Sequence, residues 1–529
     1  MKKSISIFLV TVMILTVCIT AFSTVFANAE TQSTELPASK FTGDSQKLAQ
    51  LQAAYEADIA AATKTQYDIQ SADELYALFK AINAKNATFE NWSIKLKCDI
   101  IFNEGNSNTW GDTPASYTDW PTVTTWFKGT FDGENHTISG IYISKGTSTG
   151  IAAIFKNTTT GAKIKNIGLL NSYVCGSTQV GAIVANAYGN TNLINCYSDA
   201  TVVANADVAG GIVGWDRTEG NGLVDSCVFS GYVEGQKESS GIVGTARTSA
   251  TVIKNCANFG TIVANVGTYG HAAGIVSNLH SGTVEKCINF GNITSAKNDM
   301  TGSAICGGVK STASATSIKD CYLVSGLEQT QKLVGVNDFG ASNSWTYSTI
   351  SANSIKGDAA KTALAAFDFD NEKIWSTREN DYPVPTAVKT ILEGIVPNIG
   401  AQLSVDTYTT EGENGYTAQK LRFLAGIDST ADFETIGFII TESKSGQRWN
   451  VSGNTVYESV IVATLSGNKV VNASEYDVNY LFALTLDGIP ATVDAEFVAI
   501  PYAIPTSGNI TYYGEAVTYT VTETSIAIK

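Results

Sequence analysis

The chain has 529 residues, which is enough for more than one domain. Its 49 acidic residues outnumber the 34 basic ones, and the resulting net charge of −15 argues against nucleic acid as a partner. Only 16% of the residues are charged and 47 are glycine, a composition that suits a β-rich surface kept soluble by neutral polar groups and excess carboxylates.

The first residues have the pattern of a secretory signal peptide. Two lysines precede an apolar stretch from Ile5 to Phe26, and the sequence ANA at 27–29 matches the small-x-small site that signal peptidase cleaves. We therefore expect residues 1–29 to be removed and the mature chain to start at Glu30, and the loss of two lysines takes the net charge from −15 to −17. No second long apolar run follows, so the expectation is a secreted protein, at most loosely associated with the cell surface, without membrane insertion.

Residues 30–126 are predicted to form helices and a cap. Apolar residues recur at helical spacing in the first helix, at Leu48, Leu51, Tyr55 and Ile59. In the segment 67–85, Ser71 and Glu74 form a capping box at the start of a second helix, which we expect to cover the open end of a stacked sheet.

A strand signal at 94–103 leads into a loop rich in tryptophan. Its Trp110, Trp120 and Trp126 are either an aromatic platform for a sugar ring or a cover over the core. We favour the cover, because loops beside a cap also use tryptophan to close an apolar interior.

The segment 127–340 carries an internal repeat. Five cysteines recur at spacings of 31, 29, 31 and 34 residues, namely Cys196, Cys227, Cys256, Cys287 and Cys321. A fixed period of about 30 residues means stacked coils, and six coils begin at positions 162, 191, 222, 251, 283 and 316. Since each coil supplies three short strands, the predicted fold is a right-handed parallel β-helix.

Each coil has the same three parts. The first strand supplies an apolar column of Ile164, Leu193, Val224, Ile253, Val284 and Ile318. A turn then presents a residue that we expect in left-handed backbone geometry, at Asn166, Asn195, Ser226, Asn255, Lys286 and Asp320. The second strand holds small and β-branched residues, and the third has a GIVG-like sequence, as at 211–214 and 241–244.

We interpret the cysteine column as buried thiols in the core. Disulfides are the default in an exported protein, but neighbours in a column lie one strand spacing apart, about 4.8 Å, with parallel side chains that are poorly placed for a bridge. The matching position of the first coil is Ile167, which indicates an apolar slot. Zinc would need paired CxxC spacing, which this chain lacks. The state of Cys98, Cys175 and Cys306 stays open.

Two further segments follow the repeat. Residues 341–396 are predicted to be a closing segment and linker, and residues 397–529 an antiparallel β-sandwich. Short alternating runs, such as those from Leu421 and Thr435, predict the strands of the sandwich. The fold class expected for the whole chain is therefore all-β, with a helical cap at the start of the β-helix.

The repeat resembles the GLUG-motif secreted and surface proteins of bacteria. The likeness rests on GTFDGENHTISGIYI at 129–143, on the repeated NC turns and on the GIVG strands, and it spans roughly residues 67–385. It implies an extracellular parallel β-helix, often in adhesive or polysaccharide-facing proteins, and it names no reaction. Through GAQLS at 400–404 and LRFLAGI at 421–427, the C-terminal segment is similar to accessory domains of clostridial-type secreted proteins.

One column of the repeat is not explained by the core. Three residues after each GIVG-like strand, the coils carry Tyr188, Arg217, Arg247, His280 and Lys310. Stacked at about 4.8 Å per coil, these side chains would line a track for an acidic glycan, and Trp215 would offer a face for a sugar ring. The alternative is a turn position that favours long solvated side chains.

Catalytic chemistry has no clear sequence signal. Polysaccharide lyases and hydrolases need clustered carboxylates, and we interpret the acids of two neighbouring coils as solvated loop residues, at Asp199, Asp207, Asp216 and Asp225. We predict no catalytic residue, no metal site and no cofactor.

The favoured hypothesis is a non-catalytic binding or adhesion protein that recognises a glycan or another extracellular polymer. One alternative is a polysaccharide lyase or glycoside hydrolase on a β-helix scaffold, which acids within about 5 to 10 Å of each other on one coil face would favour. Another is a structural spacer that holds the C-terminal domain, which a featureless solenoid would favour.

Overall fold

The computed structural model describes residues 36, 38–104, 107–111, 117–145, 150–217, 221–247, 251–266, 270–296, 302–309, 317–327, 331–337, 345–378, 381–393, 398–408, 416–427, 433–442, 450–451, 454–455, 460–464, 471–472, 480–490, 494–505, 510–514, 516–522 and 525–528. The expected signal peptide at 1–29 and the site candidate Lys310 lie outside these residues.

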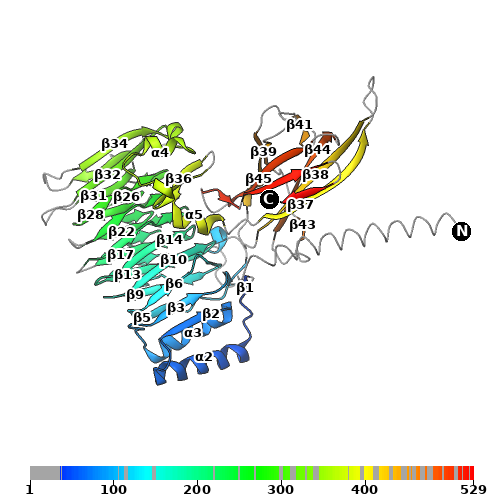
Figure 1. Cartoon of the computed structure of the whole chain (residues 1–529). Helices are drawn as coiled ribbons and strands as arrows, with labels where there is room; N and C mark the ends of the chain where they lie inside the picture. Colours follow the sequence, from blue (N-terminus) through cyan, green and yellow to red (C-terminus); the bar gives the residue numbers. More distant parts are fainter. Residues whose placement is uncertain are drawn as a thin grey trace.

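The chain forms a β-solenoid of about eight turns with about 30 residues per coil, as predicted, and Figure 1 shows its coils stacked one on another. The first face contains β1 (Ser39–Lys40), β2 (Gln66–Ile69), β3 (Ser93–Leu96), β4 (Ile100–Ile101), β6 (Thr130–Asp132), β7 (Thr137–Ser139), β10 (Lys163–Leu170), β14 (Asn192–Ser198), β18 (Leu223–Asp225), β19 (Val228–Phe229), β23 (Val252–Lys254), β24 (Ala257–Asn258), β28 (Thr283–Glu285), β29 (Ile288–Asn289), β32 (Ser317–Ser325) and β34 (Trp345–Ser351).

Two more faces close each coil. The second face contains β8 (Tyr142–Ser144), β11 (Tyr173–Gly176), β15 (Thr201–Ala204), β20 (Tyr232–Gly235), β25 (Thr261–Ala264) and β30 (Ile293–Ser295). The third face contains β5 (Val123–Phe127), β9 (Phe155–Thr158), β12 (Gln179–Gly181), β13 (Val184–Tyr188), β16 (Val208–Gly210), β17 (Val213–Arg217), β21 (Glu238–Ser240), β22 (Val243–Ala246), β26 (His271–Ala273), β27 (Val276–Leu279), β31 (Ser303–Val309) and β33 (Lys332–Asn337). Neighbouring strands within all three faces run parallel.

The predicted columns coincide with the register of the first face. Ile164 pairs with Leu193, and the pairing continues through every expected member of the column to Ile318. All six side chains are buried, since strands that close a coil must turn alternate residues into its core. The six turn residues after them have φ between 52° and 57°, the left-handed geometry that the sequence predicted.

The turns are also linked from coil to coil. Asn195 donates through Nδ2 to Oδ1 of Asn166 at 2.9 Å, and Asn166 donates in the same way to Asp132 at 2.9 Å. A further bond of this kind joins Asn255 to Asp225 at 2.8 Å. Asparagine therefore has two roles in these turns, because its backbone tolerates positive φ and its side chain ties neighbouring coils together.

The cysteine column lies in the core as unbridged thiols. All five members have no exposed surface, and Cys196 pairs with Ile167 in the register of the first face. Each Sγ donates to the backbone carbonyl two residues earlier, for example Cys256 to Lys254 at 3.0 Å. Burial raises the pKa of Cys196 and Cys256 well above the usual range. Cys98, Cys175 and Cys306 are likewise buried and unbridged.

Helices α2 (Ser45–Ala61) and α3 (Ala72–Lys85) lie at the first end of the stack (Figure 1). Ser71 is the N-cap of α3, as predicted, and its hydroxyl accepts from the backbone N–H of Glu74 at 3.3 Å. The Glu74 carboxylate accepts from the backbone N–H of Gln70 at 2.7 Å rather than from that of Ser71, so the reciprocal bond of the capping box lies one residue earlier than expected. Phe79 of α3 enters the open core and contacts Phe155 with ring centroids 5.6 Å apart. The helix therefore covers the apolar end of the solenoid.

The second part of the chain is a pair of antiparallel sheets. One contains β37 (Asn398–Tyr408), β38 (Tyr416–Ile427), β40 (Asn450–Val451), β41 (Asn454–Thr455), β43 (Val471–Asn472) and β44 (Tyr480–Pro490). The other contains β39 (Phe433–Glu442), β42 (Val460–Thr464), β45 (Ala495–Pro505), β46 (Tyr512–Tyr513), β47 (Val517–Val521) and β48 (Ile526–Ile528). Phe423 of the first sheet meets Phe438 and Phe497 of the second, which closes a common apolar core.

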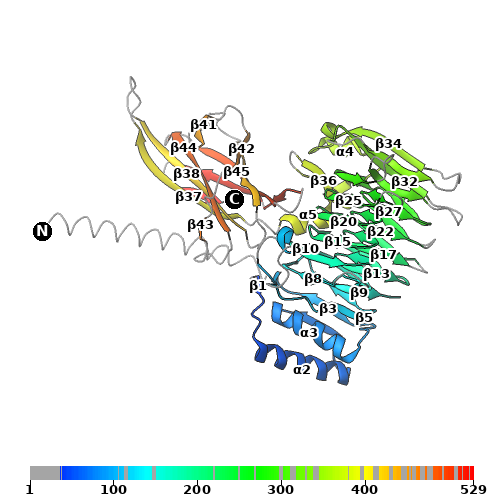
Figure 2. The same cartoon turned by 180° about the vertical axis from the view of Figure 1, so that it is seen from behind.

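Short elements join the two parts. They are the 3₁₀ helices η3 (Ala352–Ser354) and η4 (Asp370–Glu372), the helices α4 (Ala359–Ala363) and α5 (Thr386–Glu393), and the hairpin of β35 (Trp375–Arg378) and β36 (Asp381–Pro385). A further 3₁₀ turn, η1 (Ser107–Thr109), contacts the solenoid, where the backbone N–H of Ser107 donates to Asn171 at 3.0 Å. Figures 1 and 2 show α5 on the side of the solenoid that faces the sandwich. Among the described residues, no helix is both long and apolar enough to cross a membrane.

Candidate functional site

The predicted non-core column lies in register along the third face. Tyr188 of β13 pairs directly with Arg217 of β17. Arg247 follows Ala246, which pairs with Asp216, and His280 follows Leu279, which pairs with Ala246. Four of the five members of the column therefore occupy equivalent positions on successive coils. The fifth is Lys310, outside the described residues.

Trp215 and the arginines of this column form a continuous stack. The guanidinium carbon of Arg217 lies 3.8 Å from the ring centroid of Trp215 and 5.8 Å from that of Tyr188. Its Nη1 also donates to the Tyr188 hydroxyl at 3.2 Å. The Arg247 guanidinium also lies over the Trp215 ring, 4.7 Å from its centroid. Such cation–π contacts are worth about 0.5–2 kcal/mol each and restrain the arginine side chains. Trp215 is only 9% exposed, so its ring offers little face to a sugar, contrary to the prediction.

A second tryptophan extends the stack toward the cap. Trp126 of β5 lies two strands from β13, yet its ring centroid is 4.9 Å from that of Tyr188. Its side chain is 47% exposed, so the prediction that it covers the core is wrong, whereas Trp110 and Trp120 are buried as predicted. We call the set Trp126, Tyr188, Trp215, Arg217 and Arg247 the aromatic–arginine ladder.

Strand alternation explains why the ladder faces outward. The column that holds Ala187, Ala246 and Leu279 lies on these strands between the ladder positions, and all three side chains are buried in the solenoid core. Residues immediately before and after that column must then point away from the core. The signal for Trp126 was present in the sequence as the alternation VTTWF, with Trp126 one residue before the buried Phe127.

The two ladder arginines have no acidic partner among the residues that the structure describes. Within the part of the chain that the structure describes, neither Arg217 nor Arg247 forms an ion pair with a carboxylate, although the whole chain has a net charge of −15. Other basic residues of the coils do, since Lys237 pairs with Asp207 at 3.2 Å and Lys254 with Asp225 at 3.4 Å. The ladder thus presents two fixed positive charges on adjacent coils.

The four aspartates of the catalytic alternative do not come together. Asp207 and Asp225 are held by lysines on different parts of the coil. The interpretation of all four as solvated is wrong for Asp199 and Asp216, which are 0% and 2% exposed. Asp216, the residue after Trp215, belongs to the inward-facing column that contains Ala246. Asp199 is buried against the sandwich.

A glutamate, Glu238, lies on β21 of the third face, just before the short bend at residues 241–242 that leads into β22. Glu238 accepts a hydrogen bond from the Thr245 hydroxyl and another from Nδ2 of Asn278 at 2.7 Å. Both donors come from the neighbouring strands β22 and β27. These hydrogen bonds give Glu238 a structural role, because they tie β21 to β22 and β27. Glu238 is one carboxylate, whereas glycoside hydrolysis needs two.

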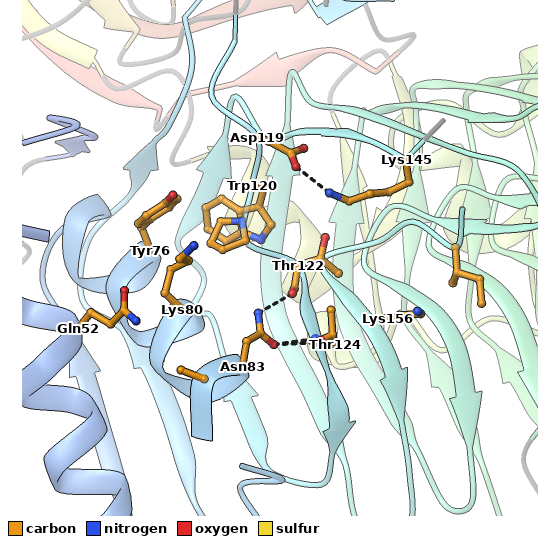
Figure 3. Close-up of a pocket in the computed structure, with 13 residues that line it drawn as sticks. Gln52, Tyr76, Lys80, Asn83, Asp119, Trp120, Thr122, Thr124, Lys145 and Lys156 are labelled. Atoms are coloured by element: carbon orange, nitrogen blue, oxygen red, sulfur yellow. Dashed lines mark hydrogen bonds and ion pairs between the residues drawn. The ribbon is translucent and has the colours of Figure 1, made fainter. Parts of the chain in front are cut away.

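A cavity of about 630 Å³ lies between the cap and the first coils, as Figure 3 shows. It is lined by residues of α2 and α3, by β5 and the segment before it, and by three later residues, namely Gln52, Tyr76, Lys80, Asn83, Ala84, Asp119, Trp120, Pro121, Thr122, Thr124, Lys145, Ile151 and Lys156. Asn83 holds the wall in place, because Nδ2 donates to the Thr122 carbonyl at 2.8 Å and Oδ1 accepts from the Thr124 N–H at 2.8 Å. Sequence patterns do not predict this cavity, because its walls come from segments far apart in the chain.

Known proteins show limited likeness to this chain. No family model matches it. A stretch of 153 residues, 28% of the chain, is 28% identical to halomucin from Haloquadratum walsbyi and spans 2% of the length of that protein. Among solved structures, a proposed immunoglobulin A1 protease from Bacteroides ovatus is similar at 18% identity with a TM-score of 0.45, over 61% of this chain and 92% of that chain.

Proposed function

We propose that this protein is an extracellular, non-catalytic binding protein that recognises an acidic polysaccharide through the aromatic–arginine ladder. The observation that supports the proposal most directly is the pair of stacked guanidinium groups, which have no carboxylate partner among the described residues of a strongly acidic chain. The expected signal peptide at 1–29 supports an extracellular location.

The ladder suits a repeating anionic ligand. Stacking against Trp215 uses the faces of the guanidinium groups. The terminal N–H groups of Arg247, and those of Arg217 that are not bonded to Tyr188, can then donate to a carboxylate or sulfate. Arg217 and Arg247 lie on neighbouring coils, about 4.8 Å apart along the solenoid axis, so one polymer can meet both. The second contact then forms within the first complex, at a high effective concentration.

The exposed ring of Trp126 adds a surface of a different kind. Aromatic faces pack against apolar patches of ligands, and Trp126 stands 47% exposed at the end of the ladder nearest the cap. A ligand that combines negative groups with apolar ring faces matches both features. Acidic sugars have this combination, whereas simple anionic polymers such as polyphosphate have only the charge.

The proposal is tested by measuring the affinity of the mature chain for polygalacturonate, by biolayer interferometry at two salt concentrations. We expect the double variant Arg217→Ser, Arg247→Ser to bind at least about tenfold more weakly, a loss of about 1.4 kcal/mol or more. The variant with lysine at both positions keeps the charge and loses the planar fork, so its affinity should fall between the two. Lys163→Ser, a change at an exposed lysine of β10 on the first face, serves as the matched control.

Unchanged affinity in the double serine variant, with an unchanged melting temperature, would rule out the ladder as the binding surface. Equal loss in the Lys163 control would show that only the overall charge matters. Binding should weaken at higher salt, because the contacts involve exposed charges.

A further inference from the structure

The cavity beside the cap has a cationic wall. Three lysines and one aspartate line it, so its wall carries a net charge of +2 on a chain of net charge −15. Lys145 is paired with Asp119 at 2.7 Å, as Figure 3 shows. Lys80 and Lys156 form no ion pair with the described residues, which leaves two cations available to an anionic ligand.

Polar groups without partners lie in the same wall. Trp120 is 1% exposed and Thr122 is 6% exposed, and both line the cavity. The indole N–H of Trp120 and the hydroxyl of Thr122 have no hydrogen-bond partner among the described residues. Leaving such buried groups unsatisfied costs about 1–3 kcal/mol each, which a ligand with hydroxyl or carboxylate oxygens would recover.

The cavity adjoins the aromatic–arginine ladder. Thr124 in its wall and Trp126 of the ladder are both on β5, two residues or about 7 Å apart. Lys156 in the wall precedes Asn157, which pairs with Trp126 across the neighbouring strands. A polymer that follows the ladder toward the cap therefore arrives at the cavity.

We infer that this cavity binds a single acidic sugar residue, such as the terminal uronate of the polymer that follows the ladder. Lys80 and Lys156 lie on opposite sides of the cavity (Figure 3), so they attract the carboxylate from two sides and one of them pairs with it, while the Trp120 N–H and the Thr122 hydroxyl meet ring hydroxyls. The volume of about 630 Å³ lies in the range of small-molecule sites and exceeds what an isolated phosphate or sulfate would fill. The inference rests on the proposed function for the identity of the ligand class, but the site itself uses none of the ladder residues.

The test uses monomeric D-galacturonate, with neutral D-galactose as the control ligand, titrated into the mature chain by calorimetry. Binding of galacturonate is expected, with loss of at least about tenfold in the variant Lys80→Gln, Lys156→Gln. The ladder variant Arg217→Ser, Arg247→Ser and the Lys163→Ser control should keep full affinity for the monomer. In a spectrum of the ¹⁵N-labelled protein, the Trp120 indole N–H resonance, identified by its loss in Trp120→Phe, should shift on addition of galacturonate.

The outcomes separate this inference from the proposed function. Absence of monomer binding, equal binding of galactose, or unchanged affinity in the Lys80, Lys156 variant would overturn the cavity site, even where the ladder variant loses the polymer. Monomer binding that depends on Lys80 and Lys156, together with polymer binding that ignores Arg217 and Arg247, would keep the cavity site and overturn the ladder.

Discussion

The turn residues show how single positions set the stability of the coils. Six of them hold positive φ, and asparagine occupies three, where its side chain also bonds to the neighbouring turn. Lys286 has φ of 53° with a long side chain in the same place. A left-handed conformation costs an ordinary L-residue about 1 kcal/mol or more, and asparagine tolerates it best after glycine.

Replacing Lys286 should therefore change stability in a direction set by the backbone. Lys286→Asn is expected to raise the free energy of unfolding by about 0.5–1 kcal/mol, whereas the β-branched Lys286→Val should lower it by at least about 1 kcal/mol. Thermal unfolding followed by circular dichroism measures both. Equal melting temperatures for the two variants would contradict the role assigned to this turn.

At the scale of residues, the sequence predicts a position correctly where one property repeats in every coil. It does not predict the burial of a residue that depends on contacts with distant parts of the chain. The apolar column and the positive-φ turns follow from a period in the sequence. The burial of Asp199 depends instead on Tyr512, more than three hundred residues away, which a local pattern does not show. Trp126 is a different case, because the local alternation of β5 already places its side chain on the outer face.

Among the elements, helix α3 is the one that caps the solenoid core. It closes the first end of the solenoid, where the strands of a coil would otherwise expose apolar residues and unpaired backbone groups. Phe79 is fully buried there and contacts Trp120, Phe131 and Phe155.

Phe79→Ala should destabilise the protein by about 3–5 kcal/mol, the usual cost of removing a buried phenylalanine ring. We also expect self-association of the variant, because the cap no longer covers the end of the stack. Thermal unfolding together with analytical ultracentrifugation tests this, with Gln50→Ala on the exposed side of α2 as the control. A change below about 0.5 kcal/mol, as for an ordinary surface site, would show that the ring does not hold the cap.

The sequence predicted the elements of the repeat more fully than the elements of the site. The period of about 30 residues reports the coil length, and the resulting register placed Tyr188, Arg217, Arg247 and His280 in line. The bend of the third face, the entry of β2 and β3 into the first face and the cavity beside the cap depend on how non-repeating segments pack. Such packing produces no repeating pattern in the sequence from which it could be predicted.

At the scale of the whole molecule, a buried polar chain joins the solenoid to the sandwich. The Tyr512 hydroxyl donates to the Asp199 carboxylate, the Tyr197 hydroxyl lies 3.1 Å from that of Tyr512, and Ser230 is 2.7 Å from Tyr197. All of these side chains are buried. Burial raises the pKa of Asp199 to about 6, although the Tyr512 hydrogen bond opposes the shift.

This raised pKa makes the junction depend on pH in a defined direction. An unfolded aspartate has a pKa of about 3.9, so the folded protein binds the proton more tightly. The stabilising contribution is complete below about pH 4 and is lost as the pH rises through about 6. Asp199→Asn mimics the neutral form, and its melting temperature relative to the parent protein should therefore rise between pH 4 and pH 7. A constant difference across that range would contradict the raised pKa.

We propose that the third face of the solenoid recognises acidic polysaccharide without cleaving it. The most direct measurement is a glycan array with the mature chain, Glu30 to Lys529, beside its Arg217→Ser, Arg247→Ser variant, with reducing-sugar and unsaturated-product assays on the same polysaccharides. Our account predicts binding to acidic glycans over neutral ones, loss of that signal in the variant and no product. Equal binding of neutral glycans, binding that survives in the variant, or release of product would contradict it.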